Sequence, residues 1–193
     1  DFISAEKKKE ARLAAQIPDD QFILLSVGNC CQVKNHQMIL EAVHLMEHKE
    51  TLHYIHVGDN DDEEKVLAEQ LGISQHITFA GTANPDKYLS VADCYVMPSL
   101  REGLSISAIE AITCGLPVIL TDVPGLRDFQ KGDFDQVYYI PLSAGALKNQ
   151  IRKLMAEKPE NSRKQSRQAK ELYSAEKSVN MYMNLYGKHE RSR

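Results

Sequence analysis

The chain has 193 residues, of which 42% are hydrophobic, so it fits one domain with a substantial core rather than a disordered or fibrous protein. Its formal net charge of −4, with acidic and basic residues interleaved, argues against a dedicated nucleic-acid-binding protein. No apolar run approaches the roughly 20 residues of a membrane-spanning helix. The four cysteines form no Cys-x-x-Cys pair and the seven histidines show no metal-ligand spacing, so we expect a reduced cytoplasmic protein without a bound metal.

The first residues, Phe2 to Gln16, have the pattern of a short charged helix that leads into the domain. Phe22 to Val27 is a continuous apolar run, which is typical of a strand covered on both faces. A loop over 28–34 and a helix over 35–49 complete the first strand–helix unit. The unit then recurs, with strands expected at 52–57, 76–79, 94–97, 117–120 and 136–140, and with helices at 63–71, 85–91, 105–114 and from 143 to about 186.

Strands that alternate with helices predict a parallel sheet with right-handed crossovers, so the fold class is a Rossmann-like, doubly wound α/β domain of about six strands. We divide the chain into a leading helix and linker at 1–18, one domain at 19–187 and a tail at 188–193. Ligands of such sheets bind beyond the carboxyl ends of the strands. The loops that follow the strands therefore form the candidate site.

The strongest motif is the pair Glu102 and Glu110, separated by seven residues around the start of a predicted helix. Gly103 lets the backbone pass close to a ligand. The free N–H groups of Leu104 and Ser105 form an anion site suited to a phosphate. Two carboxylates aimed at such a site would repel the anion, so we expect them to accept hydrogen bonds from sugar and ribose hydroxyls instead.

This motif and the segments before it resemble the Glu-x7-Glu region of the retaining GT-B glycosyltransferases of family 4. The resemblance covers most of the chain. Its other segments are Leu25-Ser-Val-Gly-Asn29 through Lys34-Asn-His36, Ile55-His-Val-Gly-Asp59, Ile77-Thr-Phe-Ala-Gly81 and Ala92-Asp-Cys-Tyr-Val-Met-Pro-Ser99. It implies that the chain is the nucleotide-sugar-binding half of a GT-B fold, without the amino-terminal half that binds the acceptor. The last helix, near Ser174–Tyr186, is expected to pack partly toward that missing half.

The resemblance also implies roles for individual residues. Glu110 would hold the ribose hydroxyls. Glu102 would contact the donor sugar and act in catalysis together with Lys34, which would neutralise the diphosphate leaving group. Gly28 would leave room for the donor or acceptor, and the backbone around Thr82 would meet the base. The remaining donor-binding residues are Asn29, Gly103, Leu104 and Ser105.

The activity that the resemblance implies is transfer, with retention, of a glycosyl group from a UDP- or GDP-type nucleotide sugar to a glycan, a lipid-linked acceptor or a small molecule. Neither a cofactor nor a metal is expected, because helix N–H groups and Lys34 would replace it. The expected partners are the nucleotide sugar and the protein's own amino-terminal domain, with no nucleic acid. The missing half is the candidate for peripheral association with the inner face of the membrane.

One position departs from the family pattern. The family usually has an arginine five residues before the loop lysine, and this chain has Asn29 there. Arg101, beside Glu102, is a candidate to supply the missing charge. The neutral side chain also supports an alternative function, a catalytically degenerate sugar-nucleotide-binding or regulatory domain. A dinucleotide-dependent dehydrogenase would require Gly-x-Gly-x-x-Gly after the first strand, whereas this chain has Gly28-Asn-Cys-Cys-Gln-Val.

Overall fold

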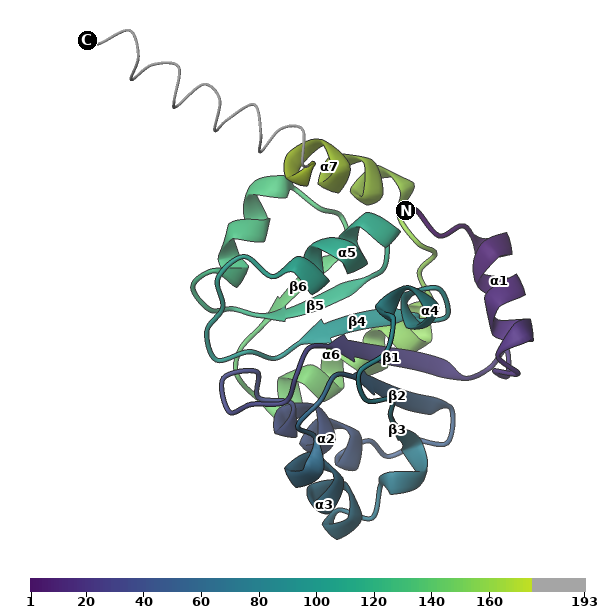
Figure 1. Cartoon of the computed structure of the whole chain (residues 1–193), viewed down its shortest axis with the longest axis vertical. Helices are drawn as coiled ribbons and strands as arrows, with labels where there is room; N and C mark the ends of the chain where they lie inside the picture. The colour runs from purple at the N-terminus through teal and green to yellow at the C-terminus, as the bar shows by residue number, and fades with distance from the viewer. Residues whose placement is uncertain (175–193) are drawn as a thin grey trace, which may run out of the picture.

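The computed structural model describes residues 1–174, so the expected continuation of the last helix to about Tyr186 and the tail at 188–193 lie outside the described residues. The elements in chain order are α1 (Ala5–Ala14), β1 (Phe22–Val27), α2 (Gln37–His44), β2 (Leu52–Val57), α3 (Asp62–Gln70), η1 (Ser74–His76), β3 (Ile77–Phe79), α4 (Pro85–Leu89), β4 (Cys94–Met97), α5 (Ile106–Cys114), β5 (Val118–Thr121), η2 (Leu126–Gly132), β6 (Val137–Ile140), α6 (Ala144–Glu157) and α7 (Arg163–Tyr173). Figure 1 shows their arrangement. None of the helices described is long and apolar enough to cross a membrane.

The six strands form one sheet in the order β3-β2-β1-β4-β5-β6, and every pair is parallel. This confirms the predicted fold class, and the strand order reverses between β1 and β4. Some local expectations were wrong. The helix after β1 ends at His44 rather than 49, because the polar residues beyond Met46 have no apolar stripe to bury. A 3-10 segment, η2, forms where a loop was expected, and it buries Leu126 and Phe129.

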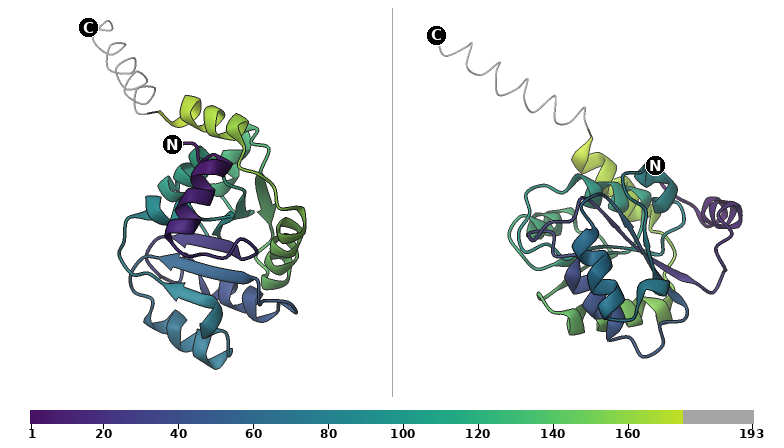
Figure 2. Two further views of the ribbon diagram at one scale, coloured as in Figure 1. Left: turned by 90° about the vertical axis from the view of Figure 1, so that its right-hand side faces the viewer. Right: turned by 60° about the horizontal axis from the view of Figure 1, so that its bottom comes forward.

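Alternate residues of the strands face two hydrophobic layers, one on each side of the sheet. In β1, Ile23 and Leu25 face the layer that contains α4, α5 and α7, whereas Phe22 and Leu24 face the layer of α2, α3 and α6. Figures 1 and 2 show these helices on opposite faces. Burial on both faces explains why the strands read as continuous apolar runs.

The segment before β1 is attached to the body of the domain at two places. At its start, the Ile3 N–H donates to Cys114 O at 3.1 Å, and Asn161 Nδ2 donates to Ile3 O at 3.0 Å. The start of the chain and α7 accordingly lie side by side in both figures. At the end of α1, Arg12 is buried against the sheet.

Asp93, just before β4, organises the second attachment. Its carboxylate pairs with the Arg12 guanidinium, and its other oxygen lies 2.6 Å from the Lys8 ammonium. The same carboxylate accepts a hydrogen bond from the Ile23 N–H at 2.7 Å. Arg12 Nε also donates to Val91 O at 3.0 Å. One carboxylate therefore connects α1, β1 and β4.

Candidate functional site

The loops that follow β1 and β4 meet at the point where the strand order reverses. The Lys34 ammonium, from the first loop, lies 2.5 Å from Oε2 of Glu102, from the second loop. Ser99 Oγ donates to the same carboxylate oxygen at 3.4 Å. The side chains of Lys34 and Glu102 are only 26% and 17% exposed. The two candidate catalytic residues are therefore in direct contact at the crevice where ligands of doubly wound sheets bind.

Hydrogen bonds hold the loop that carries Lys34 against the loop after β4. The Leu100 N–H donates to Val33 O at 2.8 Å, and Asn35 Nδ2 donates to Pro98 O at 3.1 Å. Asn35 has a φ of +55°, a left-handed conformation that asparagine adopts more readily than most residues. The placement of Lys34 thus depends on its neighbours on both sides.

Gly125, in the loop after β5, supports the Glu102 loop from behind. A Cβ at this position would overlap the Glu102 carbonyl and come within 3.0 Å of Gly103 O, and the φ of +88° also favours glycine. Gly125 was not among the candidate site residues. The Pro124–Gly125 dipeptide, a turn signal, could have identified it, although it carries no information about which loop packs against the turn.

Helix α5 begins at Ile106, one residue later than expected, because Ser105 is its N-cap. Ser105 Oγ accepts a hydrogen bond from the Ala108 N–H at 3.2 Å. Gly103 and Leu104 are exposed immediately before the cap. In the described part of the chain, no acceptor hydrogen-bonds the N–H groups of Leu104 or Ser105. These groups are available to an anion at the helix start.

Glu110 lies on the exposed side of α5. Desolvation by neighbouring atoms raises the pKa of its carboxyl, and the nearby Asp86 carboxylate acts in the same direction. Burial raises the pKa of the Tyr95 hydroxyl, and both Glu102 and Glu110 raise it further. That hydroxyl donates to Ser107 Oγ at 2.9 Å. Glu102 lies before the start of α5 and Glu110 about one turn inside it, and Tyr95 is hydrogen-bonded to Ser107 of the same helix.

A cavity of about 390 Å³ lies elsewhere, between α1 and residues 158–161. Its lining includes Lys8, Arg12 and Asp93, which are already paired with one another. It faces the amino ends of β1 and β4, whereas ligands of parallel sheets bind at the carboxyl ends. We assign no ligand to this cavity.

Comparison with known sequences identifies the family. The sequence profile of the family described as "Glycosyl transferases group 1" matches residues 7–172. The chain belongs to this family. This confirms the resemblance that the motifs indicated, at the level of the family.

Three similar proteins place this group 1 glycosyltransferase domain among longer chains. The lipopolysaccharide glucosyltransferase WaaG of Escherichia coli K12 is 28% identical over 148 residues, which are 74% of this chain and 40% of WaaG. A sucrose-phosphate synthase from Thermosynechococcus elongatus has a TM-score of 0.84 at 23% identity, covering 100% of this chain and 50% of that chain. HepE of Anabaena, solved with UDP and glucose, has a TM-score of 0.81 at 15% identity, covering 96% and 53%. The chain thus spans about half the length, or less, of these proteins.

The other candidate donor-binding loops of this group 1 domain are joined through their backbones. The Gly28 N–H donates to Val57 O at 2.9 Å, and the Gly58 N–H donates to Gly81 O at 3.0 Å. A Cβ at Gly58 would overlap the Gly28 carbonyl, so the loops after β1 and β2 cross in backbone contact. Thr82, the residue after Gly81, is exposed. The loops after β1, β2 and β3 therefore form one connected rim.

Asn29 has a structural role that the resemblance did not indicate. Its Oδ1 accepts a hydrogen bond from the Asp59 N–H at 2.9 Å, which links the loops after β1 and β2. Arg101, the candidate to supply the missing charge, is exposed, and its side chain makes no hydrogen bond or ion pair within the described residues. The neutral residue is thus part of the rim as well as a departure from the family pattern.

We expect Asn29→Arg to lower the free energy of unfolding by about 1 kcal/mol, because the Asp59 N–H loses its acceptor. Urea unfolding followed by circular dichroism would measure the change. Asn29→Asp is the matched control, since it keeps an acceptor oxygen at the same position and should change stability less. Equal stability of wild type and Asn29→Arg would contradict the structural role of Asn29.

Proposed function

We propose that this domain binds the donor of a retaining GT-B glycosyltransferase, a UDP- or GDP-type nucleotide sugar. A separate domain of a longer protein would bind the acceptor and mediate any peripheral association with the membrane. The observation that carries the proposal is the contact between Lys34 and Glu102 at the crevice, beside the start of α5. The relatives support it, because HepE was solved with UDP and glucose, and WaaG is a lipopolysaccharide glucosyltransferase.

The arrangement suits a reaction that expels a nucleoside diphosphate. Transfer breaks the bond between the anomeric carbon and the distal phosphate oxygen, so negative charge grows on the diphosphate. Lys34 and the N–H groups of Leu104 and Ser105 would stabilise that charge. Because the Lys34 ammonium lies 2.5 Å from Glu102, the diphosphate would enter beside an existing ion pair. Glu102 would then turn from the lysine toward a sugar hydroxyl.

We expect UDP or GDP to bind the chain and Glu110→Ala to weaken that binding. The loss should be about 1–3 kcal/mol, the value of hydrogen bonds to a charged group, or roughly 5- to 150-fold in Kd. Isothermal titration calorimetry with each nucleoside diphosphate would measure it. Glu69→Ala, which removes an exposed carboxylate from α3, is the control. Unchanged affinity in Glu110→Ala would exclude Glu110 from the ribose site.

The alternative function, binding of a nucleotide sugar without transfer, rests on Asn29. The neutral side chain at this position leaves Lys34 as the clear cation of the loop. A longer protein that binds the nucleotide sugar but transfers no sugar to any acceptor would favour this alternative. Transfer that is lost in Lys34→Ala would favour the enzyme, since a group acting on charge in the transition state affects turnover more than ground-state binding.

A further inference from the structure

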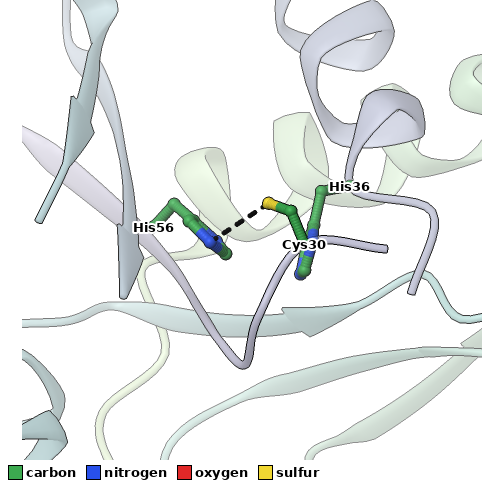
Figure 3. Close-up of side chains that lie close together, drawn as sticks. All are labelled: Cys30, His36 and His56. Carbon is green, nitrogen blue, oxygen red and sulfur yellow. Dashed lines mark hydrogen bonds between the residues drawn. The ribbon is translucent and has the colours of Figure 1, made fainter. Parts of the chain in front are cut away.

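Three buried side chains from separate segments converge beneath the loop that carries Lys34. Cys30 lies in that loop, His36 precedes α2, and His56 belongs to β2 (Figure 3). One potential ligand atom from each residue lies within 4.8 Å of the other two. Their exposed fractions are 5%, 4% and 0%. The proposed donor site uses none of these side chains.

The His56 ring is held in a fixed orientation. Its Nε2 lies 3.3 Å from Cys30 Sγ, and its Nδ1 lies 2.9 Å from Ser26 Oγ. Ser26 Oγ is in turn 2.7 Å from the Tyr54 hydroxyl. When the His56 Nδ1–H donates to Ser26 Oγ, the lone pair of His56 Nε2 faces the Cys30 thiol. Histidines that ligate metals are oriented by this kind of outer hydrogen bond.

His36 supplies a second imidazole with an unused nitrogen. Its Nδ1 is buried and has no hydrogen-bond partner among the described residues. Its ring lies 4.5 Å from the His56 ring, edge to face. Burial lowers the pKa of His36 to about 3 and that of His56 to about 4, so both rings are neutral near pH 7. An unpaired polar atom in the interior is costly, which points to a ligand at this nitrogen.

Glu64 of α3 brings a carboxylate near Cys30. Its side chain is buried, with the residue only 5% exposed. Burial raises the pKa of the Cys30 thiol, and the adjacent Glu64 carboxylate raises it further, as a nearby negative charge and hydrogen-bond partner. The cluster thus offers one sulfur and two nitrogens at mutual ligand distance, with a carboxylate beside the sulfur. This is a ligand set that divalent zinc accepts in tetrahedral geometry.

We infer that Cys30, His36 and His56 bind a divalent transition-metal ion such as Zn²⁺, and that the nearby Glu64 carboxylate supplies counter-charge. In tetrahedral geometry, bonds of about 2.3 Å to sulfur and about 2.0 Å to nitrogen would place Cys30 Sγ and His56 Nε2 ~3.5 Å apart. The two atoms lie 3.3 Å apart in the structure. The Cys30 thiol proton leaves to solvent on binding. One thiolate and one carboxylate then balance the two positive charges of the ion, as a buried position requires.

The role of the ion is structural, because the proposed donor site uses none of its ligands. The ion fastens the Lys34 loop to β2 and to the start of α2. If the proposed donor site is correct, the ion also stiffens the loop that meets the diphosphate. Cys30 and His36 are six residues apart, but His56 is distant in sequence and joins them only through the fold. For this reason no metal was expected from the sequence.

Titration of the chain with Co²⁺, in the presence of a phosphine reductant, tests the inference without any nucleotide. We expect a thiolate-to-cobalt charge-transfer band and the intense visible bands of tetrahedral cobalt, both reversed by Zn²⁺. Zn²⁺ should also raise the Tm of the apoprotein, because an ion that binds only the folded state stabilises it. Ser26→Ala should weaken binding by about 10- to 100-fold, the scale for losing an outer hydrogen bond.

The neighbouring residues offer matched controls. Cys30→Ser should abolish the charge-transfer band, whereas Cys31→Ser, at the adjacent exposed cysteine, should retain it. His56→Asn should lose the tetrahedral spectrum, whereas His53→Asn, in the same strand, should keep it. Absence of the bands in the wild-type chain would overturn the inference. So would a band that depends on Cys31 rather than Cys30.

Discussion

Replacement of Asp93 by alanine is expected to destabilise the protein by about 3–5 kcal/mol, the cost of breaking a buried ion pair from one side. The substitution leaves the Arg12 guanidinium, 8% exposed at the side chain, without its carboxylate. Lys8 loses its partner as well, and the Ile23 N–H loses an acceptor. Urea unfolding monitored by circular dichroism would measure the change in free energy.

Asp122→Ala is the control for this experiment. The Asp122 carboxylate also pairs with an arginine, Arg127, but the two side chains are 46% and 54% exposed. Exposed pairs contribute about 0–1 kcal/mol, so this variant should remain close to wild type. Similar, small losses in both variants would show that the connection between α1, β1 and β4 is not important for stability.

Gly125→Ala is expected to destabilise the protein by about 2–5 kcal/mol, combining left-handed backbone strain with overpacking. The added Cβ would overlap the Glu102 carbonyl, so the loop must move. Because that loop carries Glu102 and leads into α5, binding of UDP or GDP should weaken in the same variant. Thermal or urea unfolding and calorimetry would measure the two effects.

Gly72→Ala separates strain from overlap. Gly72 has a φ of +66°, but nothing lies within 4 Å of the position of its Cβ. The control therefore carries the left-handed penalty alone, about 1–2 kcal/mol, and should leave nucleotide binding unchanged. If Gly125→Ala costs no more than Gly72→Ala, the Glu102 loop does not depend on contact with Gly125.

The fold was predictable because its strongest determinant is local. Strands such as Phe22–Val27 and Cys94–Met97 are covered on both faces, so they read as uninterrupted apolar runs with clear ends. Helix α5 was predictable for a similar reason, since Gly115 ends it in a left-handed conformation. The 3-10 segment η2 was missed because its turns depend on the burial of Phe129 by distant residues.

The candidate site also has contacts that were predictable and contacts that were not. Lys34 and Glu102 were expected to act together, and their contact follows from the strand order, which places the loops after β1 and β4 side by side. The contact of Gly125 with the Glu102 loop and the bond from the Asp59 N–H to Asn29 were not predictable. Each of these contacts joins loops that follow different strands. The type of a residue does not indicate which other loop it will contact.

The two hydrogen bonds of Ile3 have a consequence for the order of events during synthesis. Asn161, which donates to the Ile3 carbonyl, lies 158 residues further along the chain. At a translation rate of about 5–20 residues per second, roughly 8–30 seconds separate the appearance of the two partners. The sheet can begin to assemble in that interval, while Ile3 still lacks its hydrogen bond from Asn161. The segment ahead of β1 therefore receives its last attachment only when the chain near α7 has been made.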